Sequence, residues 1–87
     1  MTMIPSSLFS VLKRFPNRKE VIQTRFSKSE TFKNICEDYQ SCLETLNHWC
    51  GQNGEIAHQR RQEYMDLIQE LEQEILQSLD HPAIKLF

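Results

Sequence analysis

The fold is decided by a stretch in the middle of the chain, residues 32–50, which reads FKNICEDYQSCLETLNHWC. Phe32, Tyr39 and Leu46 lie seven residues apart, and Ile35, Cys42 and Trp49 follow three positions after each. Alternating steps of three and four residues place side chains on one face of an α-helix. The stretch therefore predicts one continuous helix with a coiled-coil-like apolar stripe that needs a partner helix.

The next part of the chain supplies that partner. Residues 56–79 carry a second helical stripe, made of Ala57, Tyr64, Ile68, Leu71, Ile75 and Leu79. Between the two stretches lies Gly51-Gln52-Asn53-Gly54, whose Asn-Gly pair tolerates the positive φ of a turn. Because a four-residue connection makes neighbouring helices antiparallel, the sequence predicts an antiparallel helical hairpin of residues 28–50 and 55–79.

Two short helices are predicted before the hairpin, within residues 1–26. Pro16 ends the first, because proline disfavours the α conformation in the residue before it. We expect both helices to pack against the hairpin and to cover its apolar face with Leu8, Leu12, Phe15, Val21, Ile22 and Phe26. Residues 80–87 form a short tail, and the whole chain, residues 1–87, is expected to be one small all-α domain.

Capping boxes predict where two of these helices begin. In such a box a polar side chain accepts a hydrogen bond from the first helical turn, and an acidic residue stands three positions later. Asn17 with Glu20 predicts the start of the second short helix. Ser27 with Glu30 predicts the start of the first long helix.

The composition fits this fold and gives a first indication of compartment. The chain is 39% hydrophobic and 25% charged, and its two glycines are too few for a turn-dense β fold. No apolar run approaches the ~18–20 residues that span a bilayer. Residues 1–12 lack the basic start and apolar centre of a secretory signal. We therefore expect a cytoplasmic protein that makes no membrane contact.

The net charge of −2 hides an asymmetry between the two parts of the chain. Residues 1–33 hold seven Lys and Arg against two Glu, a net of +5, and residues 34–87 hold three against ten acids, a net of −7. The basic part is a candidate for contact with nucleic acid or another anion through Arg14, Arg18 and Lys19. The alternative, which we favour, is that it docks on the protein's own acidic helices.

The last helix carries more apolar residues than one seam needs. Leu67 and Leu76 lie off the main stripe, so either the N-terminal helices or a second copy must cover them. The leading hypothesis is a non-enzymatic protein–protein interaction or oligomerisation module, with itself as a homodimer or a larger protein as its partner. Its candidate interface consists of Tyr64, Leu67, Ile68, Leu71, Ile75 and Leu76.

No motif in the chain specifies a chemistry. His48, Cys50 and His58 flank the turn without the spacing of a metal site. Nucleophile elbows, Gly-rich phosphate loops and paired Glu-x-x-His motifs are absent. We therefore expect no catalytic residue, no metal and no cofactor.

The cysteines and two side chains near the turn are given other roles. Cys36, Cys42 and Cys50 are all expected to be buried, reduced thiols, with Cys50, near the helix end, the first to react. Cys50 supports a third, weaker hypothesis, a thiol redox sensor. Trp49 is expected to seal the turn end of the hairpin. Arg61 is expected to pair with an acid of the opposite helix, either Glu44 or Asp38.

The chain resembles a set of short bacterial α-helical proteins of unknown function over about residues 8–79. The similar segments are Leu12-Lys-Arg-Phe-Pro-Asn-Arg-Lys-Glu20, Phe32-x-x-Ile-Cys-Glu-Asp-Tyr39, Glu63-Tyr64 and Leu67-Ile-x-Glu-Leu-Glu-x-Glu-Ile75. The resemblance implies a helical, cytoplasmic bacterial protein. It implies no catalytic residue.

Overall fold

The chain is all-α. The structure is a computed structural model and describes residues 4–80. Helices take up 90% of the described residues, and no strand occurs among them, which confirms that the fold is all-α. In chain order the elements are α1 (Ser6–Arg14), a 3₁₀ turn η1 (Pro16–Arg18), α2 (Lys19–Lys28), α3 (Glu30–Cys50) and α4 (Glu55–Asp80). The predicted tail, from residue 81 onward, lies outside the described residues.

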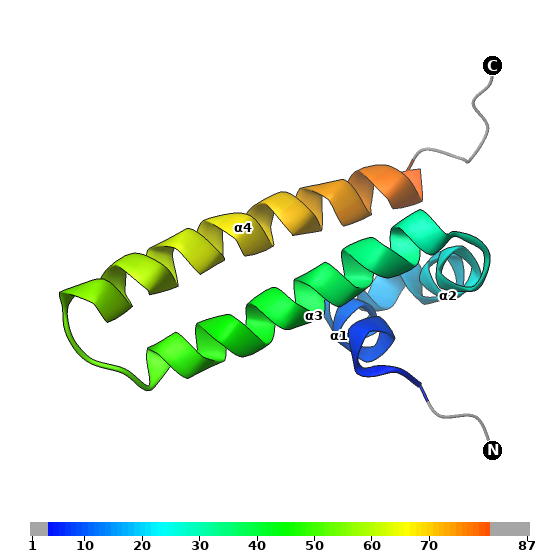
Figure 1. Cartoon of the computed structure of the whole chain (residues 1–87). Helices are drawn as coiled ribbons and strands as arrows, with labels where there is room; N and C mark the ends of the chain where they lie inside the picture. The colour runs from blue at the N-terminus through cyan, green and yellow to red at the C-terminus, as the bar shows by residue number, and fades with distance from the viewer. Residues whose placement is uncertain (1–3, 81–87) are drawn as a thin grey trace.

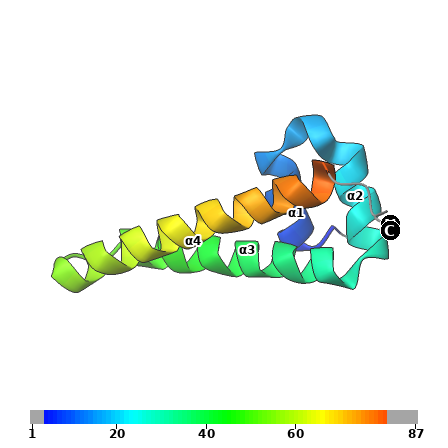
Figure 2. The same cartoon turned by 90° about the horizontal axis from the view of Figure 1, so that it is seen from above.

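The two long helices lie side by side and run in opposite directions (Figures 1 and 2). α1 and α2 lie against the end of this pair where α3 begins and α4 ends, and the turn end extends beyond them (Figure 2). α1 packs mainly on α3, whereas α2 contacts both long helices. The bracing of the pair is therefore confined to one end.

The buried core is also concentrated at the end of the long helices where α1 and α2 pack. The fully buried side chains come from all four α-helices and are Val11, Ile22, Phe32, Cys36 and Ile75. Of residues 43–67, only Ala57 is buried. The apolar stripe of α3 is thus covered at Phe32 and Tyr39 but only partly covered at Leu46 and Trp49.

The N-terminal helices cover the long pair with all six of the expected side chains, and Val11 is buried beside them. Leu8, Val11, Phe15, Ile22 and Phe26 are buried, and Leu12 and Val21 are partly buried against the same core. Of the helices formed by residues 4–80, none combines the length and apolar character needed to cross a bilayer.

The predicted capping box for α3 is wrong by two residues. Ser29 is the N-cap, and its hydroxyl accepts a hydrogen bond from the Phe32 amide at 3.1 Å. Ser27 lies in the last turn of α2, where its hydroxyl donates to the Gln23 carbonyl at 3.0 Å. Both serines stand close to Glu30, but only Ser29 has the extended backbone (φ −121°, ψ 115°) that a cap requires.

The predicted cap of α2 is also wrong. Asn17 lies inside the 3₁₀ turn that Pro16 opens, closed by a hydrogen bond from the Arg18 amide to the Phe15 carbonyl at 3.1 Å. α2 begins at Lys19, and no side chain caps it. Pro16 ends α1, and its restricted φ favours the 3₁₀ turn that follows. Because that turn includes Asn17 and Arg18, α2 begins at Lys19 and not directly after Asn17.

The turn between the long helices is held by an arginine, contrary to the expected ion pair. Gly54 has a positive φ of 108°, which suits glycine. Arg61 does not pair with an acid of α3. Its guanidinium donates to the carbonyls of Trp49 and Gln52 at 2.9 and 3.0 Å. The last carbonyls of a helix lack intrahelical partners and carry partial negative charge, so they attract a cation.

Candidate interaction surfaces

A groove of about 390 Å³ runs between α3 and α4. Its apolar lining consists of Cys42 from α3 with Tyr64, Leu67 and Leu71 from α4. Its acidic lining consists of Asp38, Glu70 and Glu74. We call these seven residues the acidic groove.

The acidic groove lies on the side of α3 that α1 leaves uncovered. α1 meets α3 at Gln40, which accepts a hydrogen bond from the Ser10 hydroxyl, and at Leu43. The groove uses Asp38 and Cys42 instead. With 3.6 residues per turn, the two sets of positions fall on opposite sides of the helix. The groove is therefore open while the other side of α3 is braced.

The six residues of the predicted interface divide into two groups. The residues that line the acidic groove are Tyr64, Leu67 and Leu71, and 42% of Leu67 is exposed. The others belong to the protomer's own core, because Ile68 and Ile75 are buried and Leu76 is partly buried against them. The structure thus leaves Leu67, but not Leu76, as a surplus apolar residue for a partner.

A second apolar surface lies on the outer side of α1, and the sequence analysis missed it. Phe9 is 56% exposed and Ile4 is 50% exposed. They line a depression of about 410 Å³ together with Leu12, Lys13, Pro16, Lys19 and Gln23. The available signal was Phe9 itself, a large apolar residue that falls outside the helical stripe of Leu8, Val11, Leu12 and Phe15.

This surface combines apolar and basic side chains. The Lys13 ammonium lies 5.9 Å from the centre of the Phe9 ring, within the range of a cation–π contact. We define the basic α1 face as Ile4, Phe9, Leu12, Lys13, Pro16 and Lys19. It is the basic counterpart of the acidic groove.

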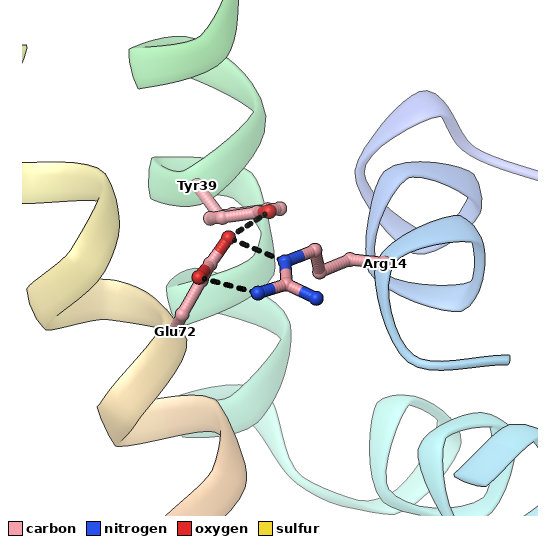
Figure 3. Close-up of polar contacts among 3 residues, drawn as sticks. All are labelled: Arg14, Tyr39 and Glu72. Atoms are coloured by element: carbon pink, nitrogen blue, oxygen red, sulfur yellow. Dashed lines mark hydrogen bonds and ion pairs between the residues drawn. The ribbon is translucent and has the colours of Figure 1, made fainter. Parts of the chain in front are cut away.

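Two of the three predicted anion-contact residues are engaged within the protein. The Arg14 guanidinium holds the Glu72 carboxylate through two hydrogen bonds, at 2.8 and 3.2 Å (Figure 3). Arg18 forms an ion pair with Asp80 at the end of α4. Lys19 lies on the basic α1 face. The basic front of the chain thus contacts its own acidic helix through both arginines.

The Tyr39 hydroxyl completes the contact around Glu72. It donates to the same carboxylate at 2.8 Å (Figure 3), and the ring is only 2% exposed. Burial, with the hydrogen bond and charge of Glu72 as further causes, raises the pKa of Tyr39. The hydrogen bond to Glu72 is the main cause that raises the pKa of Arg14. One carboxylate therefore ties α1, α3 and α4 together, which is a structural role.

The three cysteines differ in exposure, so the expectation that all three are buried is wrong for Cys50. Cys36 is fully buried, and burial together with the charge of Glu37 raises its pKa to about 12. Cys42 is partly buried in the acidic groove, and burial followed by the charge of Asp38 raises its pKa. Cys50, at the end of α3, is exposed. Within residues 4–80, no three His, Cys, Asp or Glu side chains come together in a way that could hold a metal ion.

Comparison of the chain with models of protein families, with curated proteins and with solved structures finds no match. The resemblance to short bacterial helical proteins therefore stays a prediction from the sequence. Any functional assignment rests on the two surfaces described above.

Proposed function

We propose that the protein is a non-enzymatic interaction module that binds a partner in the acidic groove. In this proposal an antiparallel hairpin of α3 and α4 presents the groove, and α1 and α2 brace one end of the hairpin. The observation that carries the proposal is the exposure of Leu67 inside a groove that also holds Tyr64 and Leu71. Fully burying a leucine side chain favours association by about 1.5–3 kcal/mol before the cost of binding.

The groove chemistry suits a short amphipathic helix with basic flanks. An apolar stripe of such a helix would cover Leu67 and Leu71, and Lys or Arg beside it would meet Glu70 and Glu74. Along α4 the lining extends from Tyr64 to Glu74, about 15 Å at the rise of an α-helix. That length corresponds to two or three turns of a bound helix.

Protein interaction is favoured over nucleic-acid binding because of the two arginine pairs. Arg14 and Arg18 would have to leave Glu72 and Asp80 before they could contact phosphates. The redox hypothesis has only the exposure of Cys50 in its favour. A cytoplasmic location stays a prediction from the sequence.

Two synthetic peptides test the proposal. Both form the same amphipathic helix, one flanked by lysines and the other by glutamates. We expect fluorescence anisotropy to show saturable binding of the Lys-flanked peptide, weakened by salt because exposed charges are screened. The Glu-flanked peptide should not bind, because the groove carries carboxylates of the same sign. Equal binding of both peptides would contradict the proposal.

Two substitutions on α4, each of which replaces an exposed apolar residue by glutamate, show where the peptide binds. Leu67→Glu places a charge in the groove and should abolish peptide binding. Met65→Glu is the matched control, because Met65 is 47% exposed on the same helix but outside the groove. Circular dichroism verifies that both variants stay helical. Binding that survives Leu67→Glu would place the peptide elsewhere and refute the groove as the site.

A further inference from the structure

The acidic groove and the basic α1 face are complementary surfaces on one molecule. They share no residue. Each has an exposed apolar centre, Leu67 in the groove and Phe9 on the face. Around these centres the charges are opposite, because acids rim the groove and Lys13 and Lys19 lie on the face.

The two surfaces of one chain cannot meet each other. α1 is fixed on the braced side of α3 by the bond from Ser10 to Gln40 and by the pair of Arg14 with Glu72. The groove opens on the opposite side of α3, at Cys42. An occupant with the chemistry of the basic α1 face must therefore come from another molecule.

We propose that the occupant of the acidic groove is the basic α1 face of a second copy of this chain. The inference rests on the proposed function and names the partner. Lengths support it, since α1, which carries Phe9, Leu12 and Lys13 of the face, has nine residues, about 13 Å, and the groove is about 15 Å long on α4. Charges support it as well, because the two lysines of one copy meet Asp38, Glu70 and Glu74 of the other.

This arrangement predicts open-ended assembly. When the face of one copy fills the groove of the next, the first copy keeps an empty groove and the second keeps a free face. Such a heterologous contact produces rings if the rotation closes and filaments if it does not. A symmetric dimer that pairs groove with groove would instead stop at two copies.

Two single-sided variants test the contact by sedimentation equilibrium between micromolar and millimolar concentration. Leu67→Glu places a charge in the acidic groove, and Phe9→Glu places a charge on the basic α1 face. Each charge would be buried at the contact without a partner, so we expect each variant alone to associate at least about tenfold more weakly than the wild type. Phe9 is 56% exposed and Leu67 is 42% exposed in the monomer, so the fold should persist. Met65→Glu and Ile56→Glu, exposed apolar positions outside both surfaces, should assemble like the wild type.

Mixing the two variants is the decisive step. The Leu67→Glu chain keeps its face and the Phe9→Glu chain keeps its groove, so one contact can form between them. We expect a complex with one chain of each kind that grows no further. A mixture that stays monomeric while the wild type assembles would overturn the inference.

Charge exchange provides a second test that leaves the apolar residues in place. A chain with both Lys13→Glu and Lys19→Glu should assemble more weakly than the wild type. Adding Glu70→Lys and Glu74→Lys to the same chain should restore assembly, because the charges again oppose each other. These four side chains are exposed, so the substitutions spare the core.

The remaining outcomes separate the inference from the proposed function. A wild type that stays monomeric at millimolar concentration overturns the inference, as does assembly that Leu67→Glu abolishes but Phe9→Glu leaves intact. In either case, Leu67-dependent binding of the Lys-flanked peptide would leave the proposed function standing. If neither that peptide nor a second copy binds, both proposals are wrong.

Discussion

Arg14 on α1 donates two hydrogen bonds to the Glu72 carboxylate on α4, which lies 58 residues later in the chain. Tyr39 of α3 donates to the same carboxylate, so three helices meet at one acid. The Arg14 side chain is 53% exposed and Glu72 is 17% exposed. Because exposed ion pairs add little stability, the contact contributes more to the placement of α1 than to the free energy of unfolding.

The buried hydroxyl of Tyr39 should have a measurable effect on stability. We expect Tyr39→Phe to lower the free energy of unfolding by about 0.5–1.5 kcal/mol, the net value of one hydrogen bond. Tyr64→Phe is the matched control, since the Tyr64 hydroxyl makes no hydrogen bond within residues 4–80. Urea denaturation measures both variants. An equal loss in the two would show that the Glu72 contact contributes nothing.

The Cys36 thiol should make the protein less stable at alkaline pH. Burial raises its pKa from 9.0 to about 12, so the unfolded chain releases this proton first. The stabilisation is complete below pH 9 and is lost as pH rises toward 12, at up to about 1.4 kcal/mol per pH unit. Tyr39 adds a loss of the same sign above pH 10, because its pKa is also raised.

Cys36→Val isolates the effect by removing the titrating group and keeping an apolar side chain. Between pH 9 and pH 10, its free energy of unfolding should fall less steeply than that of the wild type. Cys50→Val is the matched substitution at an exposed thiol. Urea denaturation at each pH gives the slopes. If the free energies of unfolding of Cys36→Val and of the wild type fall in parallel with pH, the Cys36 thiol does not cause the loss of stability.

Adjacent arginines on α4 should differ in their contribution to stability. Arg61 donates to the Trp49 carbonyl in the last turn of α3 and to the Gln52 carbonyl in the turn that follows, and we expect Arg61→Ala to cost about 1–2 kcal/mol. Among residues 4–80, Arg60 makes only an exposed pair with Glu63, so Arg60→Ala should cost less than about 0.5 kcal/mol. Thermal denaturation compares the two, and the reverse order would rule out the capping role of Arg61.

Two serines near the start of α3 distinguish the observed cap from the one that the capping box predicted. Ser29→Ala removes the side-chain acceptor for the Phe32 amide and should cost about 1 kcal/mol. Ser27→Ala removes only a bond to a carbonyl of α2 and should cost less than about 0.5 kcal/mol. Chemical denaturation decides between them. A larger loss at Ser27 would restore the cap predicted from the sequence.

Local patterns in the sequence determined the helices and most of their ends. The heptad steps from Phe32 to Leu46 predict α3, and Pro16 and Gly54 mark breaks that the structure contains. These features depend on residues within a few positions of one another. Helical spacing, a restricted φ and tolerance of a positive φ are local properties, so they can be recognised without the rest of the chain.

Only the tertiary structure decided which side of each helix faces the core. α1 carries apolar residues on more than one side, and packing against α3 buries Val11 while it leaves Phe9 exposed. On α4 the packing of the helix against its neighbours buries Ile75 and leaves Leu67 exposed. Helical periodicity defines the spacing of a stripe but not the rotation of the helix against its neighbours. That rotation, and with it the position of the acidic groove, is set by contacts between residues far apart in the chain.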